Sequence, residues 1–236
     1  MQRVMRIKVV QMIYGDLLKP DSWFQYVEQI NSLYCDIHGY EYIVDRRENI
    51  RQDRHGNWTK VESIRDNLHD CDYLLSLEGD CAVYCHSISL EEDIIPLLPA
   101  DKSVLTTINR LDHNRWGELS AVWSMLFRNN TMSDEIIAVW DNAHRCAAAE
   151  AVAFSYPFDE EGWRRYVVPR YCDHIVTLND YYLLSSQCGY FIRHIAVSSN
   201  EQRYDTFKSM WESPMMARNK ILLQNKIERA EQTCQS

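Results

Sequence analysis

A chain of 236 residues, 46% of them hydrophobic, is long enough to form one domain with a substantial core. Its formal net charge of −9 argues against binding to nucleic acid or anionic membranes through the overall field, so a nucleic-acid partner is not expected, although a local basic patch could still bind either. No apolar run approaches the length of a membrane span, and residues 1–6 lead into a strand pattern without the apolar segment of a signal peptide. This predicts a cytoplasmic protein with no transmembrane segment.

The eight cysteines form no Cys-x-x-Cys pair, which favours reduced thiols over a disulfide framework or a zinc site. Cys81, Cys85 and His86 are the one cluster of metal-binding residue types, and their spacing resembles that of a zinc site only weakly.

Residues 1–44 predict a β-α-β unit. Residues 7–13 form an apolar run of strand length, and residues 23–37 carry apolar side chains at the spacing of one helix face. Gly39 ends this helix, and residues 40–44 predict a second strand. This order favours a parallel sheet, because parallel strands need a crossover connection, usually a helix.

Residues 45–56 predict a polar loop that contains four arginines: Arg46, Arg47, Arg51 and Arg54. Arginine side chains at this density can contact phosphate. The alternative is a solvated loop whose arginines meet only water and nearby acids.

Two carboxylates follow the third predicted strand. Thr59 and Glu62 have the spacing of a capping box, which predicts a helix that leads to an apolar strand over residues 72–77. Glu78 and Asp80 come directly after this strand, and alternate residues of an extended chain point to the same side, roughly 6.5 Å apart. They can therefore share one cation, and through it a diphosphate, at the edge where open α/β sheets bind ligands. The alternative is a strand that ends in an acidic turn.

The rest of the chain predicts further short elements. Residues 119–126 have helical spacing, yet residues 123–127 fit a strand equally well. The other predictions are a helical segment at 88–98, a strand at 103–108, helices at 133–140 and 144–154, a loop at 159–166, and short apolar segments at 167–169 and 190–192. We expect one domain over residues 1–216 and an amphipathic helix or tail over 217–236.

Several short segments between residues 7 and 197 match one family in the family's own order. They are Asn31-Ser32-Leu33-Tyr34-Cys35 with His38-Gly39-Tyr40; Arg54, Trp58 and Lys60; Glu78-Gly79-Asp80; Ile88-Ser89-Leu90-Glu91; Leu119–Val122 with Leu126–Asn129; Val167–Arg170; and Gly189–Ala196. Together they resemble the retaining galactosyl-, mannosyl- and xylosyltransferases of the GT-A fold, which include fungal Golgi mannan enzymes and plant xyloglucan xylosyltransferases. Glu78-Gly79-Asp80 stands at the family's Asp-x-Asp, and His194 at its metal-binding histidine.

The resemblance implies a fold and an activity. The fold is α/β of the GT-A type, with a mostly parallel, Rossmann-like sheet flanked by helices. The activity is metal-dependent transfer of a hexose or pentose, with retention, from a nucleoside diphosphate sugar such as a UDP-sugar to a hydroxyl acceptor, for example a glycan. The cofactor is Mn²⁺ or Mg²⁺, a dication that can stabilise the diphosphate leaving group.

The resemblance also implies site residues. Asp80 and His194 would bind the metal, with Glu78 on the metal or on the donor ribose, and Asp80 also counts among the catalytic residues. Arg54, Trp58 and Lys60 are expected at the donor, with Arg46 and Arg47 as further candidates for its phosphates. In each case the alternative is a structural role, such as a core histidine for His194.

One difference between this sequence and the family pattern predicts that Glu150 is a catalytic carboxylate. The family's Asp-Gln corresponds here to Ala149-Glu150, so Glu150 would lie on the β face of the sugar, where a carboxylate can stabilise or attack an oxocarbenium-like species. Its alternative is an exposed glutamate on an alanine-rich helix. Asp141 and Asn142 are fallback candidates, and Trp116 and Trp163 can stack on a sugar if they are not core residues.

Two other functions remain open. The family's Asn-x-Gly has become Ser120-Ala121-Val122, which is compatible with a sugar-nucleotide-binding module that has lost catalysis. A metal-dependent hydrolase of nucleotide sugars would need more clustered His and Asp residues than the sequence contains.

Overall fold

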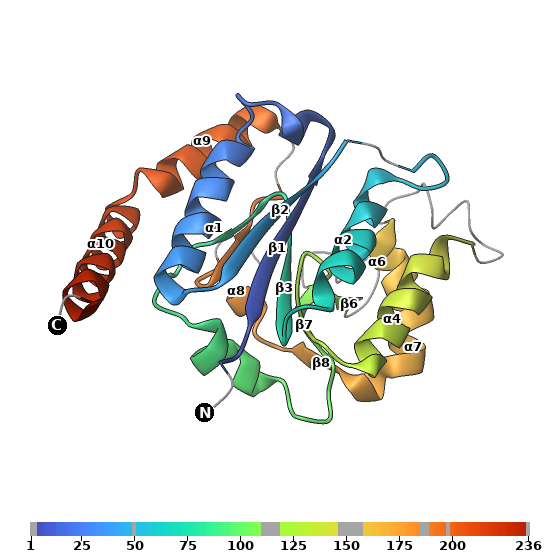
Figure 1. Cartoon of the computed structure of the whole chain (residues 1–236). Helices are drawn as coiled ribbons and strands as arrows, with labels where there is room; N and C mark the ends of the chain where they lie inside the picture. The colour runs from blue at the N-terminus through green and yellow to red at the C-terminus, as the bar shows by residue number, and fades with distance from the viewer. Residues whose placement is uncertain are drawn as a thin grey trace.

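The computed structural model describes residues 4–48, 51–109, 119–145, 158–184, 189–196 and 199–234. Within these ranges seven strands form one sheet in the order β2-β1-β3-β7-β5-β6, with β8 beside β5 (Figure 1). They are β1 (Ile7–Tyr14), β2 (Glu41–Arg47), β3 (Tyr73–Glu78), β5 (Val104–Asn109), β6 (Leu119–Ser120), β7 (Ser124–Arg128) and β8 (Ile175–Leu178). Only β6 and β7 run against the others in this described sheet, so the predicted mostly parallel sheet is confirmed.

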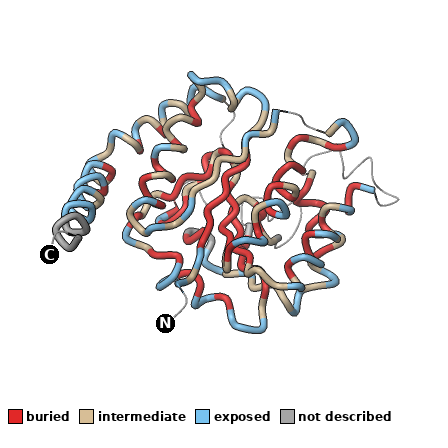
Figure 2. Tube along the Cα trace, in the orientation of Figure 1, coloured by how far each residue is buried: buried red, intermediate tan, exposed pale blue. Residues whose placement is uncertain are grey.

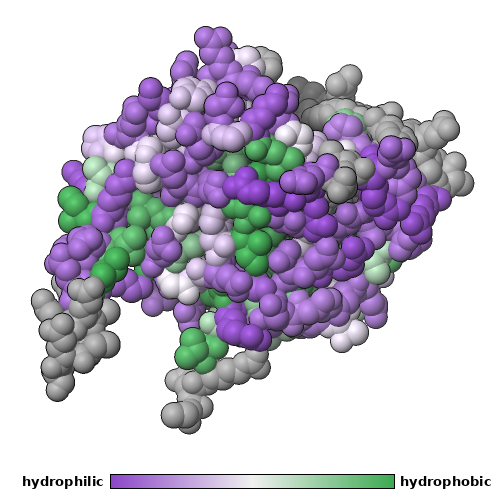
Figure 3. Space-filling view, turned by 45° about the horizontal axis from the view of Figure 1, so that its top comes forward, coloured by the Kyte–Doolittle hydropathy of each residue, from purple (hydrophilic) through white to green (hydrophobic). Residues whose placement is uncertain are grey.

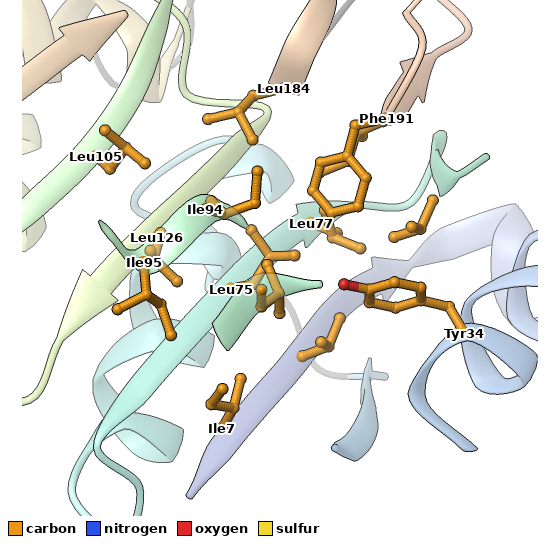
Figure 4. Packing of buried hydrophobic residues seen from close by; sticks show 14 of the residues in the cluster. Ile7, Tyr34, Leu75, Leu77, Ile94, Ile95, Leu105, Leu126, Leu184 and Phe191 are labelled. Carbon is orange, nitrogen blue, oxygen red and sulfur yellow. The ribbon is translucent and has the colours of Figure 1, made fainter. Parts of the chain in front are cut away.

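Neighbouring residues of the central strands serve different cores, because successive side chains of a strand point to opposite faces. Val9 and Leu75 belong to a cluster on one face, whereas Val10 and Leu74 belong to a cluster on the other. Figure 4 shows side chains of the first cluster meeting between the sheet and the segments that cover it. Burial on both faces explains why β1 and β3 read as nearly continuous apolar runs.

Two short helical segments and a small sheet close the first face. The segments are η3 (Leu90–Ile94) and η4 (Ile95–Leu97), at the place of the predicted 88–98 segment. The small sheet pairs β4 (Cys81–Val83) with β9 (Ile192–His194), and α8 (Tyr181–Leu184) lies next to β5 and β9. These elements bring residues from the last fifth of the chain against β3.

Helix α1 (Phe24–His38) connects β1 to β2 and ends at Gly39, whose φ of 77° lies in the left-handed region that favours glycine. A third cluster packs α1 against α9 (Asn200–Trp211) and the start of α10 (Pro214–Cys234). Helix α10 lies where the sequence predicts an amphipathic helix or tail, and Figure 2 shows that most of its described surface is exposed. No helix among the described residues is both long and apolar enough to span a membrane.

The opposite face of the sheet is covered by α2 (Thr59–Leu68), α4 (Thr131–Asn142) and a helical run after residue 157 (Figure 1). That run consists of α6 (Asp159–Gly162), η6 (Trp163–Val167) and α7 (Val168–Tyr171), so the loop predicted for residues 159–166 is wrong. The reason is tertiary packing: Trp163 is buried with its ring centroid 4.8 Å from that of Trp140. Short turns η1 (Gly15–Leu18), η2 (Gly56–Trp58), η5 (Ala143–Arg145) and η7 (Cys172–His174) complete the described elements.

Two local predictions need correction. The capping box is wrong, since Thr59 Oγ1 donates to the Gly56 carbonyl and the Glu62 carboxylate accepts from Arg54. Residues 45–47 belong to β2 rather than to a loop. Of the two alternatives for residues 123–127, the strand is confirmed over Ser124–Arg128, where Met125, Leu126 and Phe127 are fully buried between β3 and β5.

Candidate functional site

The turn that carries Glu78, Gly79 and Asp80 accepts hydrogen bonds from buried side-chain amides. Gln11 Nε2 donates to the carbonyls of Glu78 (2.8 Å), Gly79 (3.3 Å) and Cys81 (2.9 Å). Asn31 Nδ2 donates to Gln11 Oε1 (2.8 Å) and to the Cys81 carbonyl (3.0 Å). Both amides are fully buried, so they satisfy main-chain oxygens that water does not reach. Sequence analysis missed Gln11, although a polar residue in the middle of an apolar strand was a visible signal.

Strand pairing brings His194 to Asp80. In the small sheet, His194 of β9 is the register partner of Cys81 of β4. His194 Nε2 lies 3.3 Å from Asp80 Oδ1 and 3.8 Å from Glu78 Oε2, and the imidazole ring packs on Trp123 at 4.3 Å between centroids. The two carboxylates and the imidazole predicted from distant parts of the sequence therefore meet at the C-terminal end of β3.

Arg203 adds a cation to this group. Its guanidinium lies 3.5 Å from Asp80 Oδ2 and donates from Nε to the Ile195 carbonyl at 3.3 Å. Burial alone would raise the pKa of Asp80, but His194 and Arg203 outweigh it and hold this pKa below its ordinary value. Burial also opposes protonation of His194, yet the Asp80 and Glu78 carboxylates raise its pKa. Asp80 is therefore strongly held as a carboxylate. Arg203 lies in α9, and no sequence motif pointed to it.

The donor set fits a borderline divalent cation. Among the described residues, the group whose ligand atoms all lie within 4.8 Å of one another is Asp80, Cys81 and His194. Glu78 does not belong to this group, but its Oε2 lies 3.8 Å from His194 Nε2. Carboxylate and imidazole ligands suit Mn²⁺, and a cation between Asp80 and His194 would replace the proton that the imidazole otherwise takes up. Cys85 and His86 do not join this group; His86 Nε2 instead donates to the Val83 carbonyl at 2.9 Å.

Lys60 reaches the site from the first turn of α2. Its ammonium lies 2.5 Å from Glu78 Oε1 and 2.7 Å from Asp159 Oδ2. The Lys60 and Asp159 side chains are 1% and 2% exposed, which places this ion pair in the interior. Burial opposes the charge of Lys60, but Asp159 and Glu78 outweigh it and raise the pKa of Lys60. Asp159 was missed because its segment was predicted to be a loop.

The other predicted phosphate contacts already have carboxylate partners. Arg54 is 2% exposed and pairs with Glu62 and with Asp141, whose Oδ1 lies 2.6 Å away. Arg46, Arg47 and Arg51 pair with Glu28, Asp45 and Asp66, and Asp53 respectively. Trp58 and Trp163 are buried core residues. Glu150 and Trp116 lie outside the described residues.

A cavity of about 360 Å³ opens beside the two carboxylates, at the C-terminal ends of β1 and β3. Glu78, Gly79, Asp80 and Arg203 line it together with Met12, Tyr14, Asp16, Leu17, Trp23, Asn57 and Asn200. Burial raises the pKa of Tyr14 to about 12, with a further contribution from Glu78, so its hydroxyl stays protonated and donates to Asn57 Oδ1. Figure 3 brings this end of the molecule forward and shows a mainly hydrophilic surface around a smaller hydrophobic area. Three carboxylates, those of Asp16, Glu78 and Asp80, line the cavity with the Arg203 guanidinium, so the arrangement suits a cation or a polar ligand that binds together with one.

Comparisons with known proteins agree on the architecture. No family model and no curated protein matches the sequence. A solved glycosyltransferase involved in glycosylation of the major capsid of PBCV-1 is similar, with a TM-score of 0.68 and 16% identity, over 86% of this chain and 99% of that chain. The glycosyltransferase GlyE of Streptococcus pneumoniae TIGR4 gives a TM-score of 0.57 at 12% identity, over 96% and 64%. The galactosyltransferase LgtC, solved with donor and acceptor sugar analogues, gives 0.57 at 10%, over 90% and 99%.

At these identities the likeness shows the fold. The narrower resemblance to fungal and plant transferases remains a prediction from the motifs. The strand order, the helices on both faces of the sheet and these neighbours together establish that the chain has the GT-A glycosyltransferase fold.

Proposed function

We propose that the protein is a metal-dependent glycosyltransferase that moves a sugar from a nucleoside diphosphate sugar, most simply a UDP-sugar, to a hydroxyl acceptor. The observation that carries this proposal is the meeting of Asp80 and His194, 3.3 Å apart, at the edge of a 360 Å³ cavity at the C-terminal ends of parallel strands. Open α/β sheets bind ligands at this edge. The fold and the neighbouring structures support the same reading.

Each side chain of the site has a task in this reaction. Asp80 and His194 would hold Mn²⁺ or Mg²⁺, and Glu78 would act on the metal or on the ribose. When bound, the cation stabilises the charge that develops on the departing diphosphate. Arg203 is the cation that lines the described cavity, and its guanidinium can donate two hydrogen bonds to phosphate oxygens. We therefore assign to Arg203 the donor contact that the sequence assigned to Arg54 and Lys60.

The stereochemistry and the catalytic carboxylate belong to the proposal as well. The motif resemblance supports retention of configuration, with Glu150 beside the reacting carbon. A carboxylate there can stabilise an oxocarbenium-like species or attack it. Substitution of Glu150 by Ala is expected to lower kcat with little change in UDP affinity, since the side chain would act on the sugar and not on the nucleotide.

The test is a panel of UDP- and GDP-sugars with Mn²⁺, Mg²⁺ or EDTA. The measurements are thermal stability, released nucleotide and transfer to simple sugar acceptors. We expect UDP to stabilise the protein only with a divalent cation, and one donor to give acceptor-dependent UDP release with the donor's anomeric configuration kept in the product. Absence of metal-dependent nucleotide binding for every donor would contradict the proposal.

The same panel separates the other two functions. Stabilisation by UDP and Mn²⁺ without turnover of any donor would identify a binding module on the transferase fold. Nucleotide release that does not depend on an acceptor, and that yields free sugar, would identify a hydrolase.

A further inference from the structure

The Lys60 ammonium lies inside the protein between two carboxylates. It reaches Glu78 Oε1 at 2.5 Å and Asp159 Oδ2 at 2.7 Å, and its side chain is 1% exposed. The ring of Trp140 lies 6.0 Å from its nitrogen. Lys60 does not line the described cavity, although its partner Glu78 does. The lysine therefore acts behind the cavity wall and not on a ligand inside it.

This contact gives the two oxygens of Glu78 different surroundings. Oε1 is taken by Lys60, while Oε2 lies 3.8 Å from His194 Nε2. A free glutamate side chain has several rotamers, and holding one of them costs conformational entropy. The ion pair with Lys60 fixes the carboxylate with one oxygen toward the imidazole before any ligand arrives.

Asp159 fixes Lys60 in turn. The Asp159 side chain is 2% exposed, and its own main-chain carbonyl accepts from Trp140 Nε1 at 2.8 Å. If Lys60 turned toward a ligand phosphate, Asp159 would remain as an unpaired charge in the interior, which is strongly unfavourable. Asp159 therefore keeps Lys60 on Glu78 and ties the start of α6 to the turn after β3.

We propose that Lys60, fixed by Asp159, is a positioning residue that orients the Glu78 carboxylate toward His194 and so sets the geometry of the cation site. This inference rests on the proposed function, because it assumes that a divalent cation binds at Asp80 and His194. It gives Lys60 a different role from the phosphate contact expected from the sequence.

The test replaces the whole ion pair, Lys60→Met together with Asp159→Asn. This double variant removes one positive and one negative charge, so the net charge near the cation is unchanged and position 159 carries no unpaired ion in the interior. Glu78 loses its lysine partner and keeps His194 as a neighbour. Binding of Mn²⁺ is measured from the electron paramagnetic resonance signal of the free ion. We expect the Kd for Mn²⁺ to rise about 10- to 100-fold, the range for losing a partner that orients a metal ligand.

A second background shows whether the effect passes through Glu78. Glu78→Gln is measured alone and combined with the double variant, as in a double-mutant cycle. If Lys60 acts by orienting Glu78, removing the pair from the Glu78→Gln protein should change the Kd for Mn²⁺ by less than about twofold, since non-additivity is the mark of coupling. A general structural role would instead weaken binding equally in both backgrounds, and that result would overturn the inference.

The control is a second buried lysine, which lies in the sheet and away from the site. Lys8, at the opposite end of β1, pairs with Asp70 and with Glu41 at 3.8 Å. Lys8→Met with Asp70→Asn makes the same two substitutions at a lysine–aspartate pair whose aspartate is exposed, and it should leave the Kd for Mn²⁺ unchanged. If the wild-type protein binds Mn²⁺ and the Lys60 variant binds it equally well, this inference alone fails. If the wild-type protein does not bind Mn²⁺, the proposed metal dependence fails with it.

Discussion

Cys81 and His194 lie directly opposite each other in an antiparallel pair between β4 and β9, although more than a hundred residues separate them in the chain. Side chains of directly opposite residues point to the same side of a sheet. The register therefore brings His194 next to the turn that ends in Asp80, and a slip of one residue would turn the imidazole to the other face. The cation site we propose depends on this short sheet.

Asp80→Asn should remove the response to Mn²⁺. The substitution keeps the shape of the side chain and removes the charge that faces His194 and Arg203, at 3.3 and 3.5 Å. Loss of a residue that only orients a metal ligand weakens metal binding by up to ~100-fold, and loss of the carboxylate ligand itself should raise the Kd for Mn²⁺ by more than that. The thermal shift with UDP and Mn²⁺ should therefore disappear. Asp101→Asn, at an exposed carboxylate next to Lys102, is the control. An unchanged shift in Asp80→Asn would contradict the metal assignment.

Gln11→Leu should weaken both the fold and the site. It leaves the carbonyls of Glu78 and Gly79 without the Gln11 amide, whereas the Cys81 carbonyl keeps the Asn31 amide. Each buried acceptor left without a hydrogen bond lowers the stability of the fold by about 1–3 kcal/mol. We therefore expect the free energy of unfolding to fall by about 2–4 kcal/mol.

Urea denaturation measures this loss, and Mn²⁺ titration of the folded fraction should show weaker binding because the turn is no longer held. The exposed Gln29→Leu should change neither quantity. Normal Mn²⁺ affinity in Gln11→Leu would show that the amide stabilises the fold without positioning the site.

Substitution of Arg203 should affect UDP affinity, whereas substitution of Arg54 should affect stability. Arg203→Gln removes the guanidinium that lines the cavity, and we expect a roughly 10-fold or greater loss of UDP affinity, since a charge-assisted hydrogen bond contributes about 1.5–3 kcal/mol. Arg54→Gln removes the buried cation between Glu62 and Asp141, which keep Arg51 at 3.7 Å and Arg65 at 3.0 Å, and should destabilise the protein by about 1–3 kcal/mol.

Calorimetric titration with UDP and Mn²⁺, together with urea denaturation, separates the two effects. A stable Arg54→Gln protein with lost UDP affinity would restore Arg54 as the phosphate contact.

Stability should fall in mild acid because of His86. This side chain is 3% exposed, and burial, with a contribution from His38, lowers its pKa to about 4. In the unfolded chain the pKa is near 6.5, so between these values the unfolded state binds a proton that the folded state does not. This contribution is complete above pH 6.5 and decreases as the pH falls toward 4, by about 2 kcal/mol between pH 7 and pH 5.

The measurement is the free energy of unfolding of the wild type and of His86→Gln across this range. The difference between the two should shift by that amount in favour of the variant as the pH falls. The exposed His69→Gln should follow the wild type. Parallel curves for the wild type and His86→Gln would show that His86 takes up its proton without unfolding.

Local pattern was sufficient for the elements whose own residues decide their structure. The strands β1 and β3 carry apolar runs because both of their faces are buried, and α1 has one apolar face and a glycine at its end. The helical run from Asp159 to Tyr171 was missed because its burial against Trp140 comes from a partner elsewhere in the chain. Residues 123–127 were ambiguous for the same reason, since only their place between β3 and β5 makes them a strand.

The sequence by itself determined one part of the candidate site: two carboxylates after an apolar strand, at the edge where open α/β sheets bind ligands, with a histidine implied by resemblance. Only the tertiary structure decided which charges meet there. Lys60 and Arg54 are held by buried carboxylates, whereas Arg203 from α9 lines the cavity. Charged side chains take the partners that compensate their loss of water, and those partners come from elements distant in sequence. No local spacing encodes that choice.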